Sequence, residues 1–182
     1  MQFYRTYIFS ILLITGETVN MSTDILFKTE DYVFSYRVAG ILEKDGCVLL
    51  QKPSNDPGYA LPGGHVSIGE TNAETLMREF REEMGARIRV DSLAWVGEIF
   101  FPWGNRPCHQ ICLYYRVSLE DETSIPLTGS FQGFETMEGR SFDLYYHWVP
   151  ISELSKIELY PTQAKELLQN GTREVVHFVY QE

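Results

Sequence analysis

The chain has 182 residues, the length of one domain with small additions. Apolar residues make up 44% and charged residues 22%, a composition typical of a folded globular protein and not of a disordered one. Lys and Arg number 15 and Asp and Glu number 25, so the net charge of −10 argues against a nucleic acid or an acidic membrane as partner. A small anionic substrate would need a local cation to offset this charge.

Residues 1–20 are expected to lie outside the folded domain. Their apolar run at 7–14 is too short to span a bilayer, which takes about 20 apolar residues. The run also lacks the basic start and small-residue cleavage site of a signal peptide. We therefore expect Met21 to be the natural start, residues 1–20 to be an upstream translation artefact or a disordered leader, and 21–182 to form a single domain. A membrane anchor or secretion signal is the alternative.

The first structured segment is predicted to be a β-hairpin. Residues 33–42 are rich in β-branched and aromatic side chains, as in a strand. They are followed by Asp45-Gly46, a strong hairpin turn signal, and by the apolar return strand 47–52. The composition of residues 53–58 indicates a loop.

Residues 71–84 are predicted to form a helix. Thr71 and Glu74 have the spacing of a capping box, and Gly85 stands where a C-terminal cap glycine belongs. An apolar stripe recurs at helical spacing through Ala73, Leu76, Met77, Phe80 and Met84.

The remainder is predicted to alternate between strands and short helices. Strands are expected at 87–101, 109–119, 142–149 and 175–180, a long loop at 121–140, a helical turn at 151–154 and a helix at 161–170. Hairpin-connected strands on both sides of a central helix predict an α/β fold with a mixed central sheet and helices on its faces.

Three glutamates in the second half of the central helix are the candidate chemical group. Glu79, Glu82 and Glu83 stand at i, i+3 and i+4 and so share one helix face, where like charges repel. The helix C-terminus disfavours anions as well. A divalent cation would compensate, and oxygen ligands favour Mg²⁺ or Mn²⁺ over zinc. A solvated acidic face is the alternative.

The residues around these glutamates form a longer motif. From Gly64 to Ala86 the sequence matches G-x5-E-x7-R-E-U-x-E-E-x-G-U, in which U is aliphatic or aromatic. The fixed positions are filled by Gly64, Glu70, Arg78, Glu79, Glu82, Glu83 and Gly85. This is the Nudix box, and the chain therefore resembles the Nudix hydrolases. The resemblance extends loosely to the segments before and after the box.

The resemblance implies an α/β/α sandwich and a metal-dependent hydrolase that cleaves the diphosphate bridge of a nucleoside diphosphate linked to another moiety X. It implies that the metal ligands are Glu79, Glu82, Glu83 and the backbone carbonyl of Gly63. Glu79 is also a candidate general base. Arg78 would orient a box glutamate by ion pairing, the alternative being a surface cation beside Glu82. Glu70 would tie the loop to the helix.

A catalytic base on a distal loop is also known in this family. Glu135 and Glu138 are the local candidates, and Glu138 is favoured because Gly139 beside it permits close approach. A solvated loop glutamate is the alternative for either. Glu98, in the strand after the box, is another candidate ligand.

Substrate choice has weaker signals. An aromatic and polar group could stack a base and hold a phosphate, or could serve as core and loop anchors; it consists of Phe100, Phe101, Trp103, Asn105 and Arg106. Arg37 could reach a phosphate or balance the acidic site. The expected partner is a small-molecule nucleotide, with no nucleic acid and no membrane, and a homodimer is considered beside a monomer.

Two other functions are considered. One is a non-catalytic nucleotide sensor on a Nudix fold, which would not need all three glutamates. The other is an isomerase of prenyl diphosphates, which would need Cys47 or Cys108 as a catalytic thiol. The three cysteines, the third being Cys112, are expected to be reduced and at least half-buried, as in a cytoplasmic protein.

Overall fold

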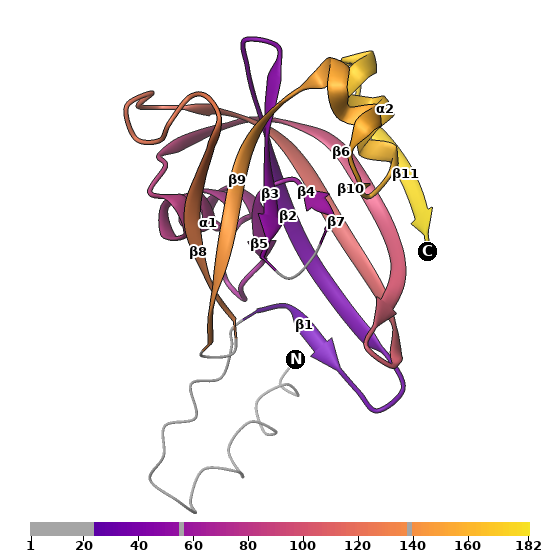
Figure 1. Cartoon of the computed structure of the whole chain (residues 1–182). Coiled ribbons are helices and arrows are strands. Elements are labelled where there is room, and N and C mark those ends of the chain that lie inside the picture. Colours follow the sequence, from indigo (N-terminus) through magenta and orange to yellow (C-terminus); the bar gives the residue numbers. More distant parts are fainter. Residues whose placement is uncertain (1–23, 55–56, 138–139) are drawn as a thin grey trace, which may run out of the picture.

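The computed structural model describes residues 24–54, 57–137 and 140–182 (Figure 1). The predicted leader, the start at Met21 and Glu138 lie outside the described residues. The elements in chain order are β1 (Leu26–Lys28), β2 (Val33–Lys44), β3 (Cys47–Pro53), β4 (Tyr59–Ala60), β5 (Gly63–His65), α1 (Asn72–Met84), β6 (Ile88–Trp103), β7 (Arg106–Leu119), β8 (Ser130–Met137), β9 (Arg140–Pro150), the 3-10 helix η1 (Ile151–Lys156), β10 (Leu159–Tyr160), α2 (Gln163–Asn170) and β11 (Val176–Gln181).

The strands form the predicted mixed sheet, with β2 at its centre. The order is β10-β4-β3-β2-β7-β6-β11, and β2 runs parallel to β7 and antiparallel to β3, β5 and β1. The β2–β3 turn is the predicted hairpin: Asp45 and Gly46 have φ of 49° and 76°, and positive φ at both positions is typical of a type I′ turn.

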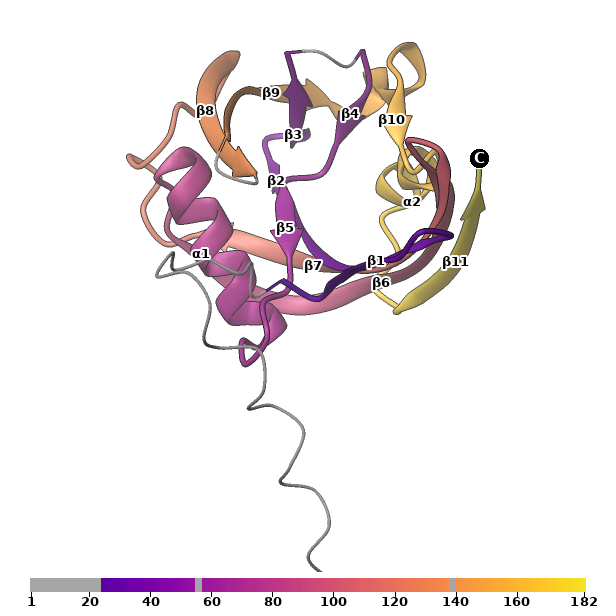
Figure 2. The same ribbon diagram turned by 90° about the horizontal axis from the view of Figure 1, so that it is seen from below.

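The two α-helices cover opposite sides of the strands, as Figure 2 shows from below. On one side Leu76 and Phe80 of α1 are fully buried in a core that includes Leu49. On the other side a second core joins Ala164 and Leu168 of α2 to sheet residues such as Trp95. A hydrophobic layer on each face of the sheet confirms the α/β/α sandwich.

Helix α1 begins and ends as its sequence predicts. Thr71 accepts a hydrogen bond from the backbone N–H of Glu74, and the Glu74 carboxylate accepts one from the backbone N–H of Thr71. At the other end Gly85 adopts φ 74°, the left-handed conformation of a cap glycine.

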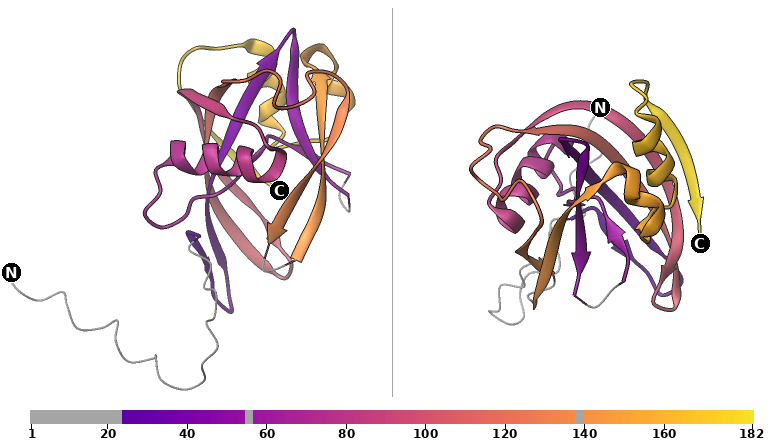
Figure 3. Two further views of the ribbon diagram at one scale, coloured as in Figure 1. Left: turned by 90° about the vertical axis from the view of Figure 1, so that its left-hand side faces the viewer. Right: turned by 45° about the horizontal axis from the view of Figure 1, so that its top comes forward.

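The predicted apolar stripe of α1 differs from the buried face at three residues. Met77 is 41% exposed, whereas Thr75 and Glu83 are buried. The burial of Glu83 is due to the β8–β9 hairpin, which lies beside α1 in the left panel of Figure 3. A Cβ on Gly133 of β8 would stand only 2.4 Å from the Glu83 carbonyl oxygen, so this strand passes close to the helix and covers Glu83.

The long loop predicted at 121–140 is also wrong. Residues 130–137 form β8, which pairs antiparallel with β9 from Ser130 opposite His147 to Met137 opposite Arg140. Its mixed composition shows no period-2 apolar pattern. The strand is specified by its pairing with β9, which a local pattern does not reveal.

Within the described residues, no helix combines the length and the apolar character needed to cross a membrane. All three cysteines are free thiols, with Cys108 and Cys112 buried and Cys47 half-buried, as predicted.

Candidate active site

The motif folds around α1 and the short strand β5. Strand β5 pairs with β2, placing Gly63 opposite Ala39 and Gly64 opposite Val38. The chain then turns into α1, whose second half carries the three glutamates. The two ends of the motif thus meet: a Cβ on Gly64 would lie 2.2 Å from the carboxyl carbon of Glu79. Only a glycine leaves room for this carboxylate.

Arg78 connects the carboxylates of this region. Its Nε and Nη2 donate to the two carboxylate oxygens of Glu70, at 2.9 and 3.0 Å. Its Nη1 donates to Glu79 at 2.8 Å and to Glu82 at 3.2 Å. These partners raise the pKa of Arg78 above its ordinary value, the Glu70 hydrogen bonds being the largest cause. Arg78 is therefore much more than a surface cation beside Glu82.

Glu70 joins the loop to the helix. Besides both Arg78 bonds, it accepts a hydrogen bond from the Thr75 hydroxyl at 2.8 Å. The Arg78 hydrogen bonds are the largest cause of a lowered pKa at Glu70, so its carboxylate is ionised at neutral pH.

Glu79 differs from Glu70 in the direction in which its pKa is shifted. Its side chain is 15% exposed, and burial raises its pKa although the charges of Arg78 and Arg37 oppose the shift. Burial disfavours the carboxylate form, so an added cation beside it would be stabilising.

Glu82 and Glu83 have contrasting surroundings. The Glu82 side chain is 56% exposed, whereas Glu83 is 5% exposed and accepts a hydrogen bond at 2.7 Å from the Tyr146 hydroxyl. Tyr146 belongs to β9 and is the partner that sequence reasoning missed. The alternating apolar pattern of β9 marks this residue as core, and nothing local distinguishes it from its neighbours.

The Gly63 carbonyl, predicted as a ligand, accepts a hydrogen bond from Nη2 of Arg37 at 2.9 Å. Arg37 lies opposite His65 in the β2–β5 pairing. His65 is 9% exposed, and burial followed by the charges of Arg37 and Lys28 lowers its pKa to about 3.

Two other candidate acidic residues, Glu98 and Glu135, lie on strands outside the motif. Glu98 on β6 pairs with His177 of β11 at 2.8 Å. Glu135 lies in β8, opposite Phe142 of β9. Glu138 is outside the described residues, so its role stays a prediction.

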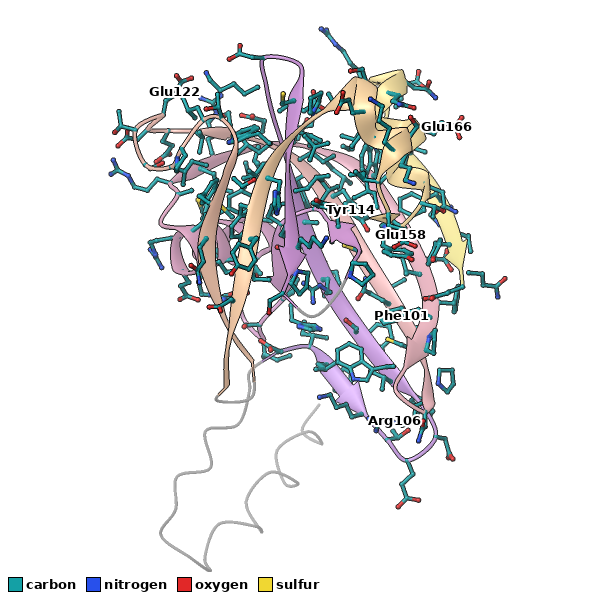
Figure 4. The ribbon with its side chains drawn as sticks, in the orientation of Figure 1. Phe101, Arg106, Tyr114, Glu122, Glu158 and Glu166 are labelled. Carbon is teal, nitrogen blue, oxygen red and sulfur yellow. The ribbon has the colours of Figure 1, made fainter. Side chains whose placement is uncertain are left out.

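The aromatic side chains predicted to stack a base lie on two different faces of the sheet. Phe101 packs against the α2-side core and lies 6.1 Å from Trp103, whereas Phe100 points the other way and stacks on His109 at 4.4 Å. Arg106, at the tip of the β6–β7 hairpin in Figure 4, donates to the Thr29 carbonyl at 2.6 Å. Core and loop anchoring therefore accounts for Phe101 and Arg106.

The donor types suit a hard divalent cation, since Mg²⁺ and Mn²⁺ prefer carboxylate and carbonyl oxygens. Across residues 24–54, 57–137 and 140–182, however, no three Asp, Glu, His or Cys side chains are grouped to hold an ion as they stand. Arg78 engages two of the helix glutamates and Tyr146 engages the third. The Glu82 pair is exposed, and such pairs contribute about 0–1 kcal/mol, so this carboxylate can exchange Arg78 for a cation at little cost.

Comparison with known proteins agrees with this geometry. The model of the NUDIX domain matches residues 32–170. Over 62 residues the chain is 48% identical to an ADP-ribose pyrophosphatase of Methanocaldococcus jannaschii, covering 32% of this chain and 37% of that protein. Over 74 residues it is 36% identical to the nucleoside triphosphatase NudI of an Enterobacter species, covering 38% and 48%. The matches thus span less than half the length of either relative.

Solved structures share the fold at low sequence identity. A MutT NUDIX hydrolase from Burkholderia pseudomallei superposes with a TM-score of 0.55 at 20% identity, covering 76% of this chain and 98% of that one. An ADP-ribose pyrophosphatase from Streptococcus suis gives 0.53 at 13% identity, covering 79% and 98%.

Proposed function

Because the chain belongs to the NUDIX domain family, we propose that it is a metal-dependent hydrolase that cleaves the diphosphate bridge of a nucleoside diphosphate linked to another moiety X. The observation that carries the proposal is the Arg78 network, in which one guanidinium holds the carboxylates of Glu70, Glu79 and Glu82. A solvated acidic face would have no need of such an arrangement.

The residues proposed to hold the cation are Glu79, Glu82, Glu83 and the Gly63 carbonyl. A carbonyl oxygen has two lone pairs, so the Arg37 bond at Gly63 leaves one for a ligand. When bound, Mg²⁺ or Mn²⁺ would offset the phosphate charges and lower the pKa of a water molecule.

Side chains of the protein itself are proposed to accept the proton and to position the carboxylates. Glu79 is proposed as a general base, because its carboxylate lies against Gly64, next to the Gly63 carbonyl that is proposed to hold the cation. Arg78 is proposed to position Glu79 and Glu82, and Glu138 remains a proposed distal base.

The substrate is proposed to be a small nucleotide. The names of the relatives suggest ADP-ribose and nucleoside triphosphates as the first compounds to assay. The net charge of −10 supports the absence of a nucleic-acid or membrane partner. We also propose a cytoplasmic location, in keeping with three free thiols, and consider a homodimer beside a monomer.

The Cys108 thiol does not favour the isomerase alternative. Burial raises the pKa of Cys108, which disfavours the thiolate that a catalytic cysteine needs.

The first experiment removes one charge at the proposed metal site. Glu82→Gln should lower kcat more than about a hundredfold, because the variant loses an anionic ligand while keeping its shape. The matched control is Glu153→Gln, whose side chain is 52% exposed and pairs with Lys156 at 3.1 Å. The control should keep full activity, and EDTA should abolish the activity of the unmodified protein. Full activity in Glu82→Gln would mean that this helix is not the metal site.

The second experiment identifies the bond that breaks. Water attacking phosphorus should convert ADP-ribose to AMP and ribose 5-phosphate. In ¹⁸O-labelled water the label should enter one phosphate product and no sugar hydroxyl. Label on the sugar carbon would exclude the proposed mechanism even if the reaction required metal.

A further inference from the structure

We propose that Lys28, Arg37, His65 and Trp103 form the subsite that binds the nucleoside monophosphate half of the substrate, with its phosphate beside the two cations and its base on the indole. We call these four residues the Trp103 cluster. The inference rests on the proposed function, because it assigns the substrate of the same site. It adds which side chains select a nucleotide over other phosphates.

Four strands bring the cluster together. Lys28 ends β1, Arg37 lies within β2, His65 ends β5 and Trp103 ends β6. The Lys28 ammonium is 5.4 Å from the Trp103 ring centroid, and the rings of His65 and Trp103 are 6.4 Å apart. No two of these residues are neighbours in the sequence.

Arg37 has the character of an anion-binding residue. It is half-buried, its bond to the Gly63 carbonyl uses one of five N–H donors, and with the described residues it forms no ion pair. Among the described residues no carboxylate lies at ion-pair distance from this partly buried guanidinium, so most of its donors are left for an anion, and their planar arrangement matches phosphate oxygens.

His65 gives an independent indication of a ligand. The residue is nine-tenths buried, and its Nε2 has no hydrogen-bond partner in the part of the chain that the structure describes. A buried polar atom left unpaired is costly, so such atoms are rare and call for a partner. The ring centroids of His65 and Trp103 are 6.4 Å apart, so this unpaired nitrogen belongs to the same cluster as the indole.

Trp103 supplies the flat apolar surface that distinguishes a nucleotide from a sugar phosphate. The indole is half-buried, and the cation above it, Lys28, is exposed. An exposed cation–π contact contributes about 0.5–1 kcal/mol, so a stacked base can compete with Lys28 for the ring face.

Arg37 also connects the cluster to the hydrolytic carboxylates. Its charge acts on both Glu79 and His65, and its guanidinium contacts Gly63, the neighbour of the glycine that packs on Glu79. A phosphate at Arg37 would therefore be adjacent to the proposed metal site.

The test measures binding without turnover. In EDTA, the affinities of the full chain for AMP, UMP and ribose 5-phosphate are measured by calorimetry. AMP and UMP should bind about tenfold or more tightly than ribose 5-phosphate, because base stacking adds to the phosphate contacts. Trp103→Leu should remove this preference and leave ribose 5-phosphate binding unchanged. Arg37→Met should weaken all three ligands about tenfold.

Phe100→Leu is the control, since this aromatic stacks on His109 on the other face of the sheet. It should keep wild-type affinities. If Trp103→Leu does not fold, Trp103→Phe should show a reduced but measurable preference. Equal binding of the three ligands to the wild type, or an unchanged preference in Trp103→Leu or Trp103→Phe, would overturn the proposal. These affinities need no hydrolysis, so they can fail while the Glu82→Gln result stands, and the reverse.

Discussion

Gly64→Ala tests the candidate site directly, because the added methyl group would contact the Glu79 carboxylate. Gly64 does not have a positive φ, so an alanine would meet no backbone strain there. Its Cβ would instead stand 2.2 Å from the carboxyl carbon of Glu79 and 2.3 and 2.6 Å from the two oxygens. Ordinary contacts need about 3.5 Å, so the carboxylate must move by roughly 1 Å. That movement stretches the 2.8 Å bond from Arg78.

The expected cost can be worked from these contacts. Overpacking a closely packed site costs about 1–3 kcal/mol, and a weakened charge-assisted hydrogen bond adds about 1 kcal/mol. Replacing glycine lowers the entropy of the unfolded chain, which returns about 0.4–1 kcal/mol. The free energy of unfolding should therefore fall by about 2 kcal/mol. The kcat should fall at least about tenfold, because a proposed catalytic group is displaced.

A double-mutant cycle with Glu79→Ala tests the cause. Without the Glu79 side chain the space beside residue 64 is empty, so Gly64→Ala should become neutral or slightly stabilising in that background. Urea unfolding of the four proteins should give a coupling free energy of about 2 kcal/mol between the two positions. An equal cost of Gly64→Ala in both backgrounds would refute the contact as its source.

Two further predictions concern the groups that hold the glutamates. Tyr146→Phe should lower the free energy of unfolding by about 1–3 kcal/mol and weaken Mn²⁺ binding about tenfold, because it removes the 2.7 Å hydrogen bond that orients buried Glu83. Tyr145→Phe, at a 39% exposed neighbour, is the control in urea unfolding and Mn²⁺ titration, and equal affinities would contradict the idea. Glu70→Gln should be about 1–3 kcal/mol less stable at pH 7, since its two Arg78 bonds lose their charge. The lowered pKa of Glu70 means that the wild type keeps this advantage above the unfolded pKa and loses it as the pH falls through the folded value. Unfolding curves recorded from pH 7 down to pH 3 should therefore converge, and a gap that does not narrow would refute the assignment.

Local chemistry was enough to predict several elements. The ends of α1 follow from the Thr71–Glu74 capping box and the Gly85 cap, since each involves residues within one turn. The β2–β3 turn follows from Asp45-Gly46, because few other residues tolerate its positive φ. The sandwich followed from the alternation of strands and helices together with the resemblance to the family.

Contacts between distant segments decided the rest. Strand β8 forms by pairing with β9, and Glu83 is buried because that hairpin crosses α1 and places the Tyr146 hydroxyl against it. The sequence by itself determined which side chains share a helix face and where the helix stops, because hydrogen bonds within a few residues control both. Only the tertiary structure decided that Gly64 receives the Glu79 carboxylate and that Arg37, His65 and Trp103 meet. The physical reason is that these contacts depend on strand order and register, which are set by long-range pairing that no local pattern encodes.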